Sequence, residues 1–163
     1  METRMNREYK STLFALIYGE NKEDLLDLVN AVNGTSYENP EEIEYTTLES
    51  DRGFFLRLKN DLSFVLDWTL GLYEHQSSPT SANVTLRFLH YYSDLLRKMI
   101  NGKLLYRTKT VKIPVPQFFV FYNGLKDEAD ETVFHLSDMF ARQADSPDID
   151  LCVRMLNINF RKS

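Results

Sequence analysis

Three polar side chains close together in the sequence have the chemistry of a divalent-cation site. Asp61 opens a run of alternating apolar and polar residues, and Glu74 and Gln76 lie in a second such run. The two runs predict a β-hairpin with strands over 61–66 and 70–76. If a four-residue turn joins them, Asp61 lies opposite Glu74, and Gln76 points to the same face by two-residue alternation.

Two carboxylates that face each other across a sheet repel unless a positive charge lies between them. A divalent cation supplies that charge, and oxygen ligands suit Mg²⁺, Mn²⁺ or Ca²⁺ rather than zinc. Such a cation can polarise a phosphate and lower the pKa of a bound water, as phosphodiester hydrolysis requires. The alternative is that Asp61 caps the strand start and Glu74 is a solvated surface residue. His75 points to the opposite face in this register and is not counted as a ligand.

Apolar periodicity predicts three helices that could support this hairpin. The first covers Tyr9–Tyr18 and ends at Gly19, and the longest covers Asn83–Asn101. The second is capped by Asn21, ends at Asn33-Gly34, and presents Leu25, Leu26, Leu28, Val29 and Val32 as its apolar stripe. The predicted buried face of the longest helix consists of Leu86, Leu89, Tyr92, Leu96 and Ile100.

Further strands are predicted on both sides of the long helix. They are Ile43–Leu48, Phe118–Tyr122, Val133–Leu136 and Leu151–Asn159, with Phe54–Leu58 as strand or loop and 137–142 as a short helical segment. The order α-α-β-β-β-α-β-β favours an α/β fold, with a mixed central sheet flanked by helices.

The composition is that of a soluble, cytoplasmic protein with one domain over residues 1–163. The N-terminus is charged, and the most apolar stretch is far too short to span a membrane, so no membrane partner is expected. The single cysteine, Cys152, cannot form an internal disulfide, and no Cys/His pattern has zinc-site spacing. Cys152 with His75, His90 or His135 could act as a thiol nucleophile, but burial in a strand for packing is the favoured interpretation.

Charge is distributed unevenly along the chain, which has a net charge of −5. From Glu20 to Asp51 there are ten acidic residues and one basic residue, whereas from Leu95 to Lys126 there are seven basic residues and no acidic one. This asymmetry could present one basic face to nucleic-acid phosphates. The alternative is two ordinary solvated surfaces.

Several segments together resemble the recombination-promoting nuclease family, also described as transposase-like PD-(D/E)XK nucleases. The hairpin carries the main resemblance, in the runs Lys59–Phe64 and Leu72–Ser77. Similar segments occur at 6–10 with Leu13-Phe14, at 30–35, at 120–124 and at 156–159, so the resemblance covers residues 6–160. It implies a restriction-endonuclease-like core that cleaves DNA with Mg²⁺, for which Mn²⁺ or Ca²⁺ can substitute.

Carried over to this chain, the resemblance implies that Asp61 and Glu74 hold the metal. Gln76 matches the position at which the broader superfamily has lysine, and its amide can orient water but supplies no positive charge. Asp67 would lie in the turn, away from Glu74, and is not chosen. Similar family members often have Lys-Asp where this chain has Lys10-Ser11, which makes these two residues candidate accessory groups.

The same resemblance implies DNA as the partner. The candidate phosphate-binding residues are Lys103, Arg107, Lys109 and Lys112. By this resemblance, the chain is expected to lack the helical C-terminal extension of longer relatives. Together with Ser11 and Gln76, this keeps a second hypothesis open: a catalytically impaired DNA-binding or regulatory module that dimerises with itself or with a full-length relative.

Overall fold

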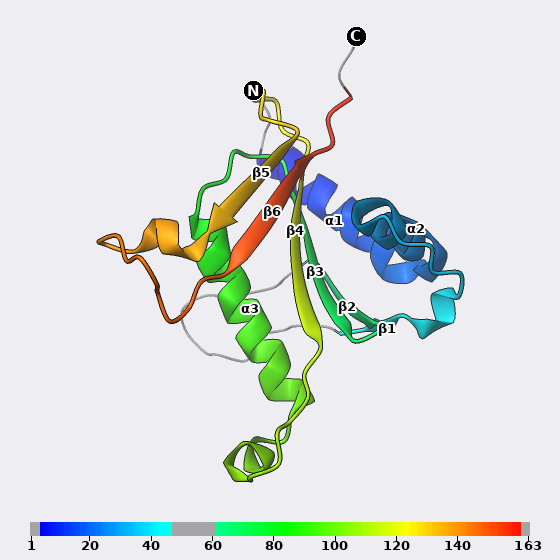
Figure 1. Cartoon of the computed structure of the whole chain (residues 1–163). Helices are drawn as coiled ribbons and strands as arrows, with labels where there is room; N and C mark the ends of the chain where they lie inside the picture. The colour runs from blue at the N-terminus through cyan, green and yellow to red at the C-terminus, as the bar shows by residue number, and fades with distance from the viewer. Residues whose placement is uncertain (1–3, 47–60, 161–163) are drawn as a thin grey trace.

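One mixed β-sheet forms the centre of the molecule (Figure 1). The computed structural model describes residues 4–46 and 61–160, and within these residues six strands lie in the order β1-β2-β3-β4-β6-β5. The strands are β1 (Glu44–Tyr45), β2 (Leu62–Leu66), β3 (Thr69–Gln76), β4 (Val115–Tyr122), β5 (Glu131–His135) and β6 (Cys152–Asn157). The pairs β3–β4 and β4–β6 are parallel and the other three are antiparallel, so the expected α/β class with a mixed sheet is confirmed.

Helices cover both faces of the sheet (Figure 1). The elements are α1 (Arg4–Glu20), α2 (Lys22–Asn33) and α3 (Asn83–Met99), with short 3₁₀ helices η1 (Pro40–Glu42), η2 (Gly102–Tyr106) and η3 (Leu136–Met139). Because side chains alternate along β3, Tyr73 packs against the α1 and α2 side, whereas Leu72 packs against α3. The sheet therefore separates two apolar cores.

The two N-terminal helices differ in how well their ends were predicted. In α2 the side chain of Asn21 accepts hydrogen bonds from the backbone N–H groups of Glu23 and Asp24, and Gly34 ends the helix with a left-handed φ of 63°, as expected. The predicted end of the first helix at Gly19 is wrong, since α1 continues to Glu20. Only Asn21 separates the two helices, so its capping role, rather than the glycine, sets the boundary.

The predicted buried face of α3 is also wrong. The helix buries Val84, Thr85, Phe88, Tyr91 and Leu95 against the sheet, whereas Leu86 is exposed and Leu89, Tyr92 and Leu96 are partly buried. Both stripes have helical spacing and both are apolar, so periodicity alone does not choose between them. In the structure, the stripe that contains Phe88 faces the sheet, and the Phe88 ring packs against Phe118 of β4 with ring centroids 5.4 Å apart.

The hairpin β2–β3 has the predicted register. Ser63 pairs with Leu72, and Leu66 pairs with Thr69, so the turn is centred between Asp67 and Trp68. Both central residues have positive φ, 46° and 57°, which is the geometry of a type I′ turn. This turn matches the right-handed twist of the two strands and thereby fixes the register.

The remaining strands depart from the predictions mainly at their ends. Strand β1 has only two residues, and the predicted segment 54–58 lies outside the described residues. The three strands predicted after the long helix are all present, as β4, β5 and β6. Pro116 is tolerated within β4 because β6 pairs with that strand only from Phe119 onward. Cys152 is exposed at the start of β6, so the expectation that it is buried for packing is wrong.

Candidate metal centre

The hairpin brings Asp61 next to Glu74, as the predicted register requires. Leu62, the first residue of β2, pairs with Tyr73, and Asp61 directly precedes it. The Asp61 Oδ2 atom accepts a hydrogen bond from the backbone N–H of His75 at 2.8 Å. The carboxylate is therefore fixed beside the Glu74–His75 peptide, at the end of β3.

Glu74 is buried in an unusual place for an acid. It is 6% exposed, and its Oε2 atom accepts a hydrogen bond from Arg87 Nη2 at 2.7 Å. The same guanidinium nitrogen lies 3.1 Å from the Oε1 atom of Gln76, to which it also donates. Arg87 lies in the second turn of α3 and thus links two side chains of β3 that point to the same face.

Burial dominates the electrostatics of this cluster. The pKa of Glu74 is raised to about 7, mainly because burial desolvates the carboxylate; Arg87 opposes this rise and the nearby Asp61 carboxylate adds to it. A hydrogen bond from Tyr91 also favours the ionised form of Glu74. In turn, burial and the Glu74 carboxylate raise the pKa of Tyr91, so its hydroxyl stays protonated at neutral pH. The effect of Asp61 on the pKa of Glu74 shows that these two carboxylates are close enough to interact.

The donor types at the site match a hard cation. Two carboxylates and the amide oxygen of Gln76 are the oxygen ligands that Mg²⁺ and Ca²⁺ prefer. However, Arg87 already contributes a positive charge to Glu74 and Gln76, so a metal ion would compete with the guanidinium for the same oxygens. The residues present fit a divalent ion, on the condition that Arg87 moves away from Glu74.

Arg87 and Tyr91 are the site residues that sequence reasoning missed as partners of Glu74. They lie 13 and 17 positions beyond Glu74, on the helical stripe next to the one predicted to be buried. The arginine itself could have predicted the pair. A basic residue beside the stripe of Val84, Phe88 and Tyr91 can reach a buried acid on the sheet that this stripe covers.

Ser11 approaches the same end of β3 from α1, on the other side of the sheet, and Lys10 directly precedes it in the helix. The Ser11 Oγ atom lies 3.4 Å from His75 Nδ1 and donates a hydrogen bond to the His75 carbonyl oxygen at 3.3 Å. The His75 ring also packs against Phe14 and contacts Asn123 through Nε2 at 2.9 Å. His75 therefore points away from Glu74, as predicted.

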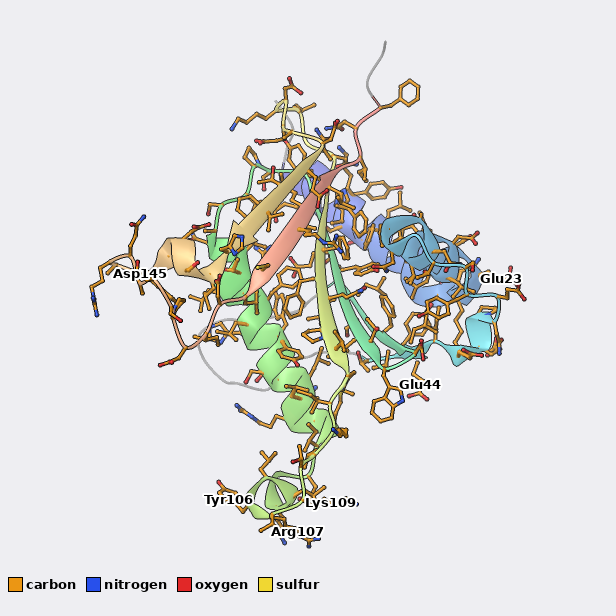
Figure 2. All side chains as sticks on the ribbon, viewed as in Figure 1. Glu23, Glu44, Tyr106, Arg107, Lys109 and Asp145 are labelled. Carbon is orange, nitrogen blue, oxygen red and sulfur yellow. The ribbon has the colours of Figure 1, made fainter. Side chains whose placement is uncertain are left out.

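The basic residues chosen as DNA contacts lie at the far end of α3. All four are exposed, and they belong to η2 and the segment after it: Lys103, Arg107, Lys109 and Lys112. Figure 2 shows Arg107 and Lys109 at the tip of this projecting segment. Met99, the last residue of α3, is twelve positions beyond Arg87, or about 18 Å along the helix axis. The structure does not bring these residues together with Asp61 and Glu74.

Comparisons with known proteins identify no relative. No protein-family model, curated protein or solved structure matches the chain. Among the described residues, no helix has the length and apolar character needed to span a membrane. The functional assignment therefore depends on the geometry of the chain itself.

Proposed function

We propose that this chain is a metal-dependent DNA endonuclease with low sequence specificity. Its fold would be a restriction-endonuclease-like core related to that of the recombination-promoting nucleases. The observation that supports the proposal is the position of Asp61, Glu74 and Gln76 at one end of the β2–β3 hairpin, in the predicted register. Two acids and an amide at this end of one hairpin support the proposal, with Gln76 at the position where the broader superfamily has lysine.

In this proposal the Asp61 and Glu74 carboxylates hold Mg²⁺, and Mn²⁺ or Ca²⁺ can take its place. The ion supplies a Lewis acid for the scissile phosphate and lowers the pKa of a water molecule. Gln76 orients that water through its amide but cannot add charge. Arg87 leaves Glu74 and donates to a phosphate oxygen, for which it retains a buried Nε–H that has no hydrogen-bond partner among the described residues.

The experiment is plasmid cleavage by the purified chain with Mg²⁺ or Mn²⁺. Asp61→Asn and Glu74→Gln are expected to slow cleavage by about a hundredfold or more, since a catalytic metal contributes several kcal/mol to the transition state. Glu131→Gln, at an exposed position on β5, is the matched control and should cleave like the wild type. Intact plasmid with the wild type, or equal cleavage by Glu74→Gln, would reject the proposal.

A second candidate function is a non-catalytic DNA-binding or regulatory module that pairs with itself or with a longer relative. The observation that favours it is the Arg87 ion pair, because a guanidinium already neutralises Glu74 in the way that a metal would. This candidate predicts DNA binding in the presence of a chelator and a dimer by light scattering, without cleavage. A monomer that binds neither DNA nor a longer homologue would exclude it.

A further inference from the structure

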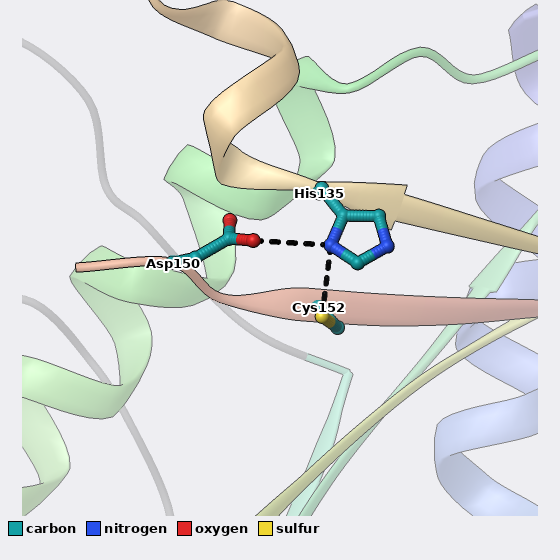
Figure 3. Close-up of side chains that lie close together, drawn as sticks. All are labelled: His135, Asp150 and Cys152. Carbon is teal, nitrogen blue, oxygen red and sulfur yellow. Dashed lines mark hydrogen bonds and ion pairs between the residues drawn. The ribbon is translucent and has the colours of Figure 1, made fainter. Parts of the chain in front are cut away.

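A second group of potential metal ligands lies at one end of the β5–β6 pair (Figure 3). His135, the last residue of β5, is the cross-strand partner of Cys152, the first residue of β6. Their side chains share one face of the sheet, and the Cys152 Sγ atom lies 3.1 Å from His135 Nδ1. Asp150, two residues before Cys152, places its Oδ2 atom 3.1 Å from the same nitrogen. None of these residues belongs to the Asp61–Glu74 site.

Backbone contacts hold this group in position. The Asp150 Oδ1 atom accepts a hydrogen bond from the backbone N–H of Ser137 at 2.9 Å, which leaves Oδ2 directed at His135. The backbone N–H of His135 donates to Asp138 Oδ2 at 3.2 Å, at the start of η3. Ligands that are oriented by hydrogen bonds of this kind are characteristic of metal sites in proteins.

A thiol nucleophile does not account for this geometry. In a catalytic relay the base uses one ring nitrogen for the nucleophile and the other for the orienting acid. Here both Cys152 and Asp150 approach Nδ1, and a neutral imidazole nitrogen either donates or accepts but cannot do both. Partial desolvation raises the pKa of the exposed Cys152 thiol, and the carboxylates of Asp150 and Asp138 raise it further, which is the opposite of thiolate activation.

A cation between the three side chains resolves this conflict. The candidate ligand atoms of His135, Asp150 and Cys152 all lie within 4.8 Å of one another. Tetrahedral zinc needs nitrogen–sulfur and nitrogen–oxygen separations of about 3.4–3.6 Å, so the two contacts to His135 Nδ1, now 3.1 Å, need to lengthen by only a few tenths of an ångström.

We propose that His135, Asp150 and Cys152 bind a zinc ion. Imidazole, thiolate and carboxylate are zinc ligands, whereas Mg²⁺ does not select sulfur or nitrogen. Three protein ligands leave a fourth position for water or another small ligand, as in open zinc sites. Asp150 and Cys152 also line a cavity of about 490 Å³, together with the apolar side chains of Leu89, Tyr92 and Phe118.

The test uses Co²⁺ as a spectroscopic substitute for zinc, with the full chain free of any polyhistidine tag. Because Cys152 is the only cysteine, a thiolate-to-cobalt charge-transfer band in the near-ultraviolet can arise only at this position. We expect the band to saturate at one equivalent of Co²⁺ and to disappear on addition of one equivalent of Zn²⁺. Cys152→Ser should abolish it, and His135→Ala or Asp150→Asn should weaken Co²⁺ binding tenfold or more.

Matched controls separate this site from others on the molecule. His90→Ala changes an exposed histidine of α3, and Asp148→Asn changes an exposed acid two residues from Asp150, so both should keep the wild-type band and affinity. Glu74→Gln should keep them as well, since it alters the other site. Circular dichroism checks that each variant is folded. Absence of the band in folded wild-type protein, or a band that His135→Ala leaves unchanged in strength and affinity, overturns the proposal.

Discussion

Arg87 donates to the buried carboxylate of Glu74 at 2.7 Å, and this ion pair joins α3 to the centre of the sheet. The acid lies on β3 and the base on the helix that leads from β3 to β4. Burial of Glu74 favours its neutral form and Arg87 favours its charged form, and burial is the larger of these two opposing effects. A proton and the guanidinium therefore compete for one carboxylate, and a metal ion would compete with both if the proposed function is correct.

Stability should depend on pH through Glu74. Its pKa is about 7 in the folded chain and 4.5 when exposed, so between these values the folded state binds more protons than the unfolded state. The contribution of Glu74 to stability is therefore fully present below about pH 4.5 and is lost as the pH rises through 7, by up to about 3 kcal/mol. Urea unfolding at several pH values should show this loss relative to Glu74→Gln, and parallel pH curves for the two proteins would contradict it.

Replacing Arg87 should leave the buried carboxyl group of Glu74 without its positively charged partner. In Arg87→Met the pKa of Glu74 is expected to rise above about 7, because the group that lowers it is gone. At pH 8 we expect a loss of about 1–3 kcal/mol in the free energy of unfolding, at the lower end of the range for a broken buried pair because Arg87 is partly exposed. A double-mutant cycle with Glu74→Gln measures the coupling. A cost that is the same at pH 5 and pH 8 would show that the side chain acts by packing alone.

The turn of the hairpin offers a stabilising substitution. Trp68 has a φ of 57°, a left-handed conformation that costs a residue with a side chain roughly 1–2 kcal/mol, and its side chain is 68% exposed. Trp68→Gly should therefore raise the free energy of unfolding by about 1 kcal/mol, as measured by thermal or urea unfolding. Trp68→Ala is the control, since it removes the ring but keeps the Cβ atom, and it should bring no such gain.

The turn also illustrates what the sequence could and could not predict. The register was predictable because the turn length and the two-residue alternation of both strands are local features. Alternation in β6 also carried an unused signal: it places Cys152 on the same face as exposed Arg154, opposite buried Val153. The Arg87–Glu74 pair was not predictable, because it depends on which of two apolar stripes of α3 meets the sheet, and only tertiary packing decides that.

DNA binding should depend on the exposed tip after α3 if the proposed function is correct. Each cation that neutralises a phosphate contributes about 0.9 to the slope of log affinity against log salt concentration on duplex DNA. Arg107→Ala and Lys109→Ala are each expected to reduce this slope by about one, as measured by fluorescence anisotropy at several salt concentrations.

The control for this experiment is Lys126→Ala. Lys126 is also exposed, but it pairs with Glu128 at 3.2 Å and follows the C-terminal end of β4, whereas the tip precedes the N-terminal end of that strand. It should keep the wild-type slope. If the tip variants also keep it, their side chains make no phosphate contact, and the DNA-binding surface lies elsewhere.

The parallel pairing of β3 with β4 has a consequence for synthesis of the chain. The hairpin can close as soon as β3 is made, but its other edge must wait for residues 77–122, a further 46 residues. At about 5–20 residues per second, β3 remains an open edge for roughly 2–9 s on the ribosome. During that interval the unpaired edge of β3, an apolar strand with the acid Glu74 near its end, can pair with strands of other chains. This is therefore the stage at which a nascent chain is most prone to aggregate.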